Sequence, residues 1–147
     1  MTTRELKLEQ LVSAPPSTVY RYLTESGKWA MWQGERASID ARPGGRFSMD
    51  MANGMTAEGE FVELVPNVRV VFTWGWVNHP DLPPGSTTVE IVLSEVRTGT
   101  RVILTQRQLP EAEWHTHQVG WRHYLPRLAT VAAGGEPGPD PGPGPGS

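Results

Sequence analysis

The stretch that decides the fold is residues 110–133, PEAEWHTHQVGWRHYLPRLATVAA. A stripe along it repeats at alternating spacings of four and three, which places its members on one helix face: Trp114, Gln118, Trp121, Leu125, Leu128 and Ala132. Pro110 stands where a first-turn proline is tolerated, and Gly134-Gly135 stands where glycine commonly closes a helix. The pattern therefore predicts one long C-terminal helix with a broad apolar face that a sheet must cover.

Two residues inside this helix are unfavourable for it. Gly120 costs about 1 kcal/mol relative to alanine in a helix interior, so we expect a close backbone approach or a cavity at that position. Pro126 removes a hydrogen bond to Arg122 and costs roughly 3 kcal/mol. We expect a kink at Pro126, with the proline on the solvent side.

The rest of the chain is expected to form one strand, two short helices and about six antiparallel strands. A half-buried strand is expected at residues 6–11, a helix from residues 14–17 to Ser26-Gly27, and a helical turn at residues 28–32. The later strands alternate polar and apolar residues at 37–41, 46–51, 57–65, 68–77, 87–94 and 100–106, with Asn53-Gly54 as the strongest hairpin signal. This order predicts an α+β fold in which a curved antiparallel sheet wraps around the long C-terminal helix.

Length and composition predict a single domain at residues 1–133, followed by a disordered, Pro/Gly-rich tail at residues 134–147. A net charge of -3 with scattered basic residues gives no reason to expect a nucleic-acid partner. Without cysteines there are neither disulfides nor thiolate zinc sites. The first ten residues lack the apolar run of a signal peptide, and no stretch approaches a membrane span. We therefore expect a cytoplasmic protein with no membrane partner; its oligomeric state stays open.

Several short motifs recur in an order that resembles a known superfamily. They are Ala14-Pro15-Pro16, Trp29 with Trp32, residues 42–47 (RPGGRF), 59–63 (GEFVE), 72–74 (FTW), 99–102 (GTRV), and Gly120-Trp121 with Tyr124-Leu125. Over residues 4–133 the chain resembles the START-like (SRPBCC) superfamily. The branch that it most resembles is named for the C-terminal domain of the activator of the heat-shock-protein-90 ATPase.

The resemblance implies the helix-grip (START/Bet v 1-like) fold, with two short helices after the first strand and a hydrophobic cavity between the sheet and the long helix. Members of the superfamily include lipid carriers, plant-hormone binders and polyketide aromatase/cyclases. Nothing in the chain resembles the separate N-terminal domain that the co-chaperone also uses. Gln106 stands where many relatives have a histidine, which argues against chemistry that depends on a histidine there.

Large aromatic side chains and methionines are unusually frequent for one small domain. Such residues usually fill a core, but they also line cavities for apolar ligands, with a few polar groups that fix the orientation of the ligand. The residues expected to line a ligand cavity are Trp29, Trp32, Phe47, Met49, Phe61, Phe72, Trp74, Trp76, Gln106, His117 and Trp121.

The titratable residues form no evident catalytic or metal-binding group, and we expect neither a cofactor nor a metal. His115 and His117 are two apart, so on a helix they point in different directions and cannot share an ion. Glu60 and Glu63 are three apart on a strand and are expected on opposite faces. Glu63 would then share a face with Phe61 and form a salt bridge, with Arg46 or Arg69 as the partner.

Three functions are compatible with these observations. The leading hypothesis is a non-enzymatic module that binds a small hydrophobic or aromatic molecule between the sheet and the helix of Trp121. The second is an aromatase/cyclase-like enzyme, which requires His117 or Glu63 to face the cavity. The third is a protein-interaction domain, which predicts a closed core and an exposed apolar patch.

Overall fold

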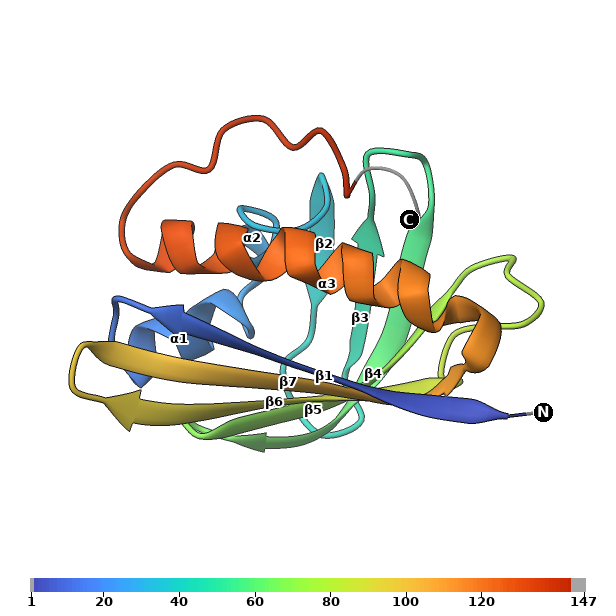
Figure 1. Ribbon diagram of the computed structural model, residues 1–147, viewed down its shortest axis with the longest axis horizontal. Helices are drawn as coiled ribbons and strands as arrows, with labels where there is room; N and C mark the ends of the chain where they lie inside the picture. Colours follow the sequence, from blue (N-terminus) through green and yellow to red (C-terminus); the bar gives the residue numbers. More distant parts are fainter. Residues whose placement is uncertain (1, 144–147) are drawn as a thin grey trace.

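The computed structural model describes residues 2–143. In chain order its elements are β1 (Thr3–Val12), α1 (Pro16–Tyr22), α2 (Ser26–Trp29), β2 (Arg36–Ile39), β3 (Arg46–Asp50), β4 (Thr56–Val65), β5 (Arg69–Trp76), β6 (Thr87–Val96), β7 (Gly99–Pro110) and α3 (Glu111–Ala132). The strands form one seven-stranded antiparallel sheet in the order β1-β7-β6-β5-β4-β3-β2. In Figure 1 the sheet curves beneath α3, which lies across its concave face. The predicted α+β helix-grip architecture is confirmed.

Helix α3 buries four of the six predicted stripe residues, whereas Trp114 and Gln118 are only half-buried. Its buried residues are His117, Trp121, Tyr124, Leu125, Leu128, Val131 and Ala132. The helix continues through Pro126, which is exposed as expected because an outward-facing proline leaves the packed face intact. Pro110 proves to be the N-cap residue at the end of β7, and not part of the first turn.

The two glycines after the helix close it in the predicted way. The Gly135 N–H donates to the Thr130 carbonyl over 2.9 Å, and the Gly134 N–H donates to the Val131 carbonyl over 3.0 Å. These two bonds form a Schellman motif, which requires the left-handed backbone that Gly134 adopts at φ 91°. The chain therefore turns sharply at this point.

The hairpin predicted at Asn53-Gly54 joins β3 to β4, and Gly54 has the positive φ (85°) that such a turn needs. On the concave side of this hairpin Phe47, Met49 and Met51 are all buried. The inward alternation predicted for β3 is thereby confirmed.

Glu63 does not share a face with Phe61. A bulge in β4 pairs Phe61 with Phe72 but Glu63 with Val71, so the alternation of side chains shifts by one residue. Glu63 consequently lies on the outer face, together with Glu60, and forms an ion pair with Arg69 over 2.7 Å. The salt bridge was predicted, but the face was wrong because a bulge has no clear signal in the residue alternation.

Beyond α3 the chain turns back along the helix towards the β3–β4 hairpin (Figure 1). The Arg127 guanidinium donates to the Gly138 carbonyl over 3.0 Å, and His123 Nε2 lies 2.6 Å from the Asp140 carboxylate. Disorder of the tail stays a prediction, and its last four positions, 144–147, fall outside the described residues.

Candidate functional site: a pocket between the sheet and α3

A pocket of about 660 Å³ lies between β5 and α3, a volume typical of small-molecule sites. Its wall is formed by Gln33, Met51, Ala52, Asn53, Met55, Trp74, Trp76, His79, Glu113, Thr116, His117, Gly120, Trp121, Tyr124, Pro141, Gly142 and Pro143. These residues come from five parts of the chain: the segment after α2, the β3–β4 hairpin, β5 with the loop that follows it, α3 and the tail.

Three indoles form the apolar part of the wall. Trp74 lies 5.5 Å from Trp76 and 5.2 Å from Trp121 between ring centroids. Trp74 and Trp76 are two residues apart on β5, so they share the face towards α3, and Trp121 meets them from the helix. This arrangement offers flat, polarisable surfaces to a ligand.

Gly120 contributes open space to the pocket. A Cβ added at Gly120 would meet no atom within 4 Å, apart from its own helix backbone and chain neighbours. Tight helix packing therefore does not require this glycine, and the alternative expected from the sequence, a cavity, is what the structure contains.

Both ring nitrogens of His117 are engaged. The Trp76 Nε1–H donates to His117 Nε2 over 3.1 Å, and His117 Nδ1 lies 2.9 Å from the Glu113 carbonyl, which can only accept. The ring is thus a neutral imidazole with its proton on Nδ1. Burial lowers the pKa of His117, against smaller raising effects from the Glu113 carbonyl and carboxylate. His117 orients Trp76 and has no nitrogen free for a ligand.

A pair of titratable side chains in the wall, His79 and Glu113, was not predicted as a site. His79 Nε2 lies 2.9 Å from a Glu113 carboxylate oxygen, and His79 Nδ1 accepts the Leu82 N–H over 3.1 Å. The two residues are 34 positions apart, one in a loop and one in the first turn of α3. Only the docking of the helix onto the sheet brings them together, so no spacing in the sequence signals the pair.

Tyr124 lies one turn along α3 from Trp121. Burial raises the pKa of its hydroxyl to about 12, with a smaller raising effect from Asp140, so the group stays protonated at neutral pH. Its O–H points towards Met51 Sδ at 4.0 Å.

The other sequence-predicted site residues do not line this pocket. Trp29, Trp32, Met49, Phe61 and Phe72 are absent from the pocket wall and belong to the buried core. Within that core the ring of Trp29 packs against Trp32 over 4.9 Å and against Phe72 over 5.6 Å between centroids.

Gln106 is also buried in the core, although a position in the cavity wall was expected. Its Oε1 accepts the Trp121 Nε1–H over 2.8 Å, and its Nε2 donates to the Thr87 hydroxyl over 3.0 Å. Gln106 therefore supports Trp121 from behind the pocket wall.

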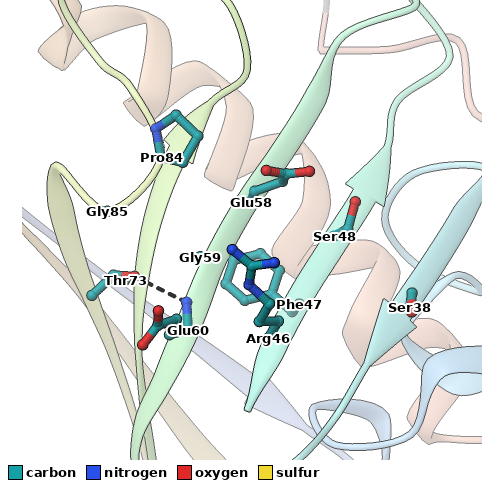
Figure 2. Close-up of a pocket in the computed structure, with 10 residues that line it drawn as sticks. All are labelled: Ser38, Arg46, Phe47, Ser48, Glu58, Gly59, Glu60, Thr73, Pro84 and Gly85. Carbon is teal, nitrogen blue, oxygen red and sulfur yellow. Dashed lines mark hydrogen bonds between the residues drawn. The ribbon is translucent and has the colours of Figure 1, made fainter. Parts of the chain in front are cut away.

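Phe47 borders a different pocket, of about 600 Å³, on the outer face of the sheet. Figure 2 shows Arg46, Ser48 and Glu58 on the near side of β3 and β4, with α3 behind the strands. The Glu60 N–H of β4 donates to the Thr73 hydroxyl of β5 over 3.0 Å. The wall of this pocket is mainly small and charged side chains, so the pocket beside α3 is the better candidate for an apolar ligand.

Within residues 2–143, no group of three or more His, Asp or Glu side chains is close enough to hold a metal ion. No helix in the same range has the length and apolarity needed to cross a membrane.

A seven-stranded curved sheet that grips a long C-terminal helix, with a pocket between them, defines a START-like domain of the helix-grip class. Residues 13–133 match the family model described as Activator of Hsp90 ATPase homolog 1-like protein, and the chain belongs to this family.

Individual relatives agree with this assignment. An AHSA1-like protein of Rhizobium etli, solved by solution NMR, is 40% identical, with a TM-score of 0.76 over 95% of this chain and 88% of that one. DynU16, from the dynemicin biosynthetic locus, has the same fold, with a TM-score of 0.79 and 21% identity over 90% of this chain and 48% of that one.

Human activator of 90 kDa heat shock protein ATPase homolog 1 is 25% identical over 122 residues, which are 83% of this chain. The chain spans about a third (35%) of the length of that curated relative.

Proposed function

We propose that this domain binds a small, mainly apolar, ring-containing molecule in the pocket between β5 and α3. The observation that carries the proposal is the open space beside Gly120, which faces the indoles of Trp74, Trp76 and Trp121. A domain selected for stability alone gains from alanine at an interior helix position, because glycine there costs about 1 kcal/mol. The presence of glycine at this position, beside an aromatic wall, supports a binding role for the space.

The pocket surface favours apolar and aromatic ligands over charged ones. Glu113 is paired with His79, His117 is neutral, and no lysine or arginine belongs to the wall. A flat ring placed among the three indoles would lose water from both faces and gain stacking contacts.

Fluorene is a suitable probe because it is a flat hydrocarbon smaller than the pocket. Titration of fluorene into the protein should change tryptophan emission and raise the melting temperature by mass action. Gly120→Leu should abolish both effects while the domain stays folded, since the new side chain enters open space. Arg122→Leu is the matched control: it adds the same side chain to the exposed side of α3, so fluorene binding should persist.

Two results would contradict the proposal. One is a wild-type protein that shows no saturable response to fluorene. The other is a folded Gly120→Leu variant that binds fluorene with unchanged affinity, because the ligand would then occupy another place. Unfolding of Gly120→Leu would itself show that the position needs tight packing.

A second candidate function is an aromatase/cyclase-like activity in the same pocket. The His79–Glu113 pair favours it, because a carboxylate bonded to an imidazole can exchange a proton with a ligand. The roles suggested from the sequence for His117 and Glu63 have less support, since His117 is fully bonded and Glu63 lies on the outer face.

A simple test of this second candidate is the aldol cyclisation of heptane-2,6-dione to 3-methylcyclohex-2-enone and water, followed by ultraviolet absorption. An enzyme of this kind should accelerate the reaction over buffer, and Glu113→Gln should remove the acceleration while fluorene still binds. Equal rates with and without the wild-type protein would count against catalysis.

The third proposal is a protein-interaction domain, which predicts a closed core and an exposed apolar patch. The pocket between β5 and α3 supports ligand binding over this proposal.

A further inference from the structure

Hydrogen-bond donors and acceptors at the pocket are unequally satisfied. Three side-chain acceptors of the wall are already engaged: His117 Nε2 accepts from Trp76, and Gln33 Oε1 accepts the Trp29 Nε1–H over 2.9 Å. One oxygen of the Glu113 carboxylate is paired with His79. Donors in the same wall are less completely engaged.

Trp74 supplies a buried donor that lacks an acceptor within residues 2–143. Its side chain is 2% exposed, and its Nε1–H has no acceptor among the residues that the structure describes. The two neighbouring indoles differ, because the Trp76 N–H bonds His117 and the Trp121 N–H bonds Gln106. A buried N–H without an acceptor is rare in native proteins and calls for an explanation.

Two further side chains of the wall carry donors. Gln33 is 2% exposed, and its amide oxygen accepts the Trp29 N–H, which leaves the N–H groups of the same amide as donors. The Tyr124 hydroxyl contacts only the weak acceptor Met51 Sδ, at 4.0 Å. All three donors belong to side chains of the pocket wall.

The carboxylate of the pocket lies apart from Tyr124. Glu113 and Tyr124 are eleven residues apart on α3, which corresponds to about 16 Å along the helix axis. The Tyr124 hydroxyl and the Glu113 carboxylate therefore border different parts of the pocket.

We infer that the ligand carries a hydrogen-bond acceptor, such as a carbonyl oxygen on a ring system, which accepts the Trp74 indole N–H. Gln33 and Tyr124 supply further donors to the same atom or to a neighbouring one. Trp74 thereby becomes the residue that distinguishes a ring ketone from the corresponding hydrocarbon. This inference rests on the proposed function and adds the chemical class of the ligand.

Fluorene and 9-fluorenone test the inference because they share one skeleton and differ by a single carbonyl group. If the pocket offers no donor, fluorenone should bind more weakly than fluorene, because its oxygen loses hydrogen bonds to water. With a bond to Trp74 it should bind about tenfold more tightly than fluorene, the ratio expected for one additional hydrogen bond. The measurement is the ratio of the two dissociation constants, obtained by tryptophan fluorescence.

Two Trp→Phe variants show which indole N–H causes the preference for fluorenone over fluorene. Trp74→Phe keeps a ring but removes the N–H, so the ratio should fall to about one or below. Trp121→Phe is the matched control, because its N–H is already bonded to Gln106; it should weaken both probes alike and keep the ratio. Folding of each variant is checked by circular dichroism.

The wild-type protein gives an independent measurement if Trp74→Phe does not fold. In a proton–nitrogen correlation spectrum the Trp74 indole proton should move downfield with fluorenone and much less with fluorene.

Equal binding of the two probes to the wild-type protein, or a ratio that survives in folded Trp74→Phe, would overturn the inference and leave the proposed function standing. Failure of both probes to bind would overturn the proposed function, and the inference with it.

Discussion

The two hydrogen bonds of His117 couple the helix to the sheet through a neutral ring. A second proton on the imidazole would occupy Nε2 and break the bond from Trp76. Burial is the main cause of the lowered pKa; His79 lowers it further, and Glu113 partly opposes the shift. In the unfolded chain the same residue has its ordinary pKa near 6.5.

A pH-dependent stability follows from this difference. Below pH 6.5 His117 binds a proton in the unfolded chain but remains neutral in the folded protein until the pH reaches its lower, folded pKa. The contribution of His117 to the free energy of unfolding is therefore complete above pH 6.5, and it is lost as the pH falls through the folded pKa. His117→Gln can still accept from Trp76 but does not titrate. The unfolding free energy of the wild type should therefore fall more steeply between pH 7 and pH 5 than that of the variant. Parallel curves from urea denaturation would show that His117 does not titrate on unfolding.

Trp121 is the residue on which the packing of α3 depends most. It is 2% exposed, its ring lies tilted against that of Trp74, and its N–H donates to the fully buried Gln106. Trp121→Ala should reduce the unfolding free energy by about 3–5 kcal/mol, because it opens a cavity and leaves Gln106 Oε1 unpaired. Trp114→Ala, at a half-buried position of the same helix, should reduce the unfolding free energy by less than Trp121→Ala does. A loss below about 1 kcal/mol for Trp121→Ala in urea denaturation would contradict this placement.

At the scale of elements, the pocket owes its shape to α3 and to the segment that follows it. Gly120 opens the wall from the helix, whereas Pro141, Gly142 and Pro143 border it from the tail. The tail is attached through few side chains, chiefly Arg127 to Gly138 and His123 to Asp140. It contributes little apolar burial to the fold but part of the boundary of the pocket.

Deletion of residues 136–147 should accordingly separate stability from binding. The melting temperature should change by less than about 2 °C, because a loss well below 1 kcal/mol shifts it only slightly. Dissociation of fluorene should become faster, since the tail no longer covers one side of the pocket. A fall of several degrees in a thermal melt would mean that the tail is an integral part of the fold. An unchanged dissociation rate would mean that it does not cover the ligand.

The whole molecule shows how far sequence patterns extend. Alternation on β3 and the stripe on α3 give the inward faces, because the periods of strands and helices are fixed by backbone geometry. The same alternation does not predict which element packs against each inward-facing side chain. Trp29 and Trp74 both point inward and are both buried (1% and 2% exposed), yet only Trp74 borders the pocket beside Gly120.

The remaining differences have the same origin in tertiary contacts. The bulge that moves Glu63 to the outer face depends on how β4 pairs with β5. The His79–Glu113 pair exists only after α3 has docked on the sheet. Such features depend on partners distant in the sequence, so they cannot be predicted from local periodicity.

The six tryptophans allow one direct test of the central claim, that the space between the sheet and α3 is the binding site. Three of their indoles line the pocket (Trp74, Trp76 and Trp121), and three do not (Trp29, Trp32 and Trp114). The measurement is a proton–nitrogen correlation spectrum of the six indole N–H groups during a titration with fluorene. The account predicts saturable shifts of the first three signals and little change in the other three. Shifts confined to Trp29, Trp32 or Trp114, or no shifts at all at saturating fluorene, would contradict it.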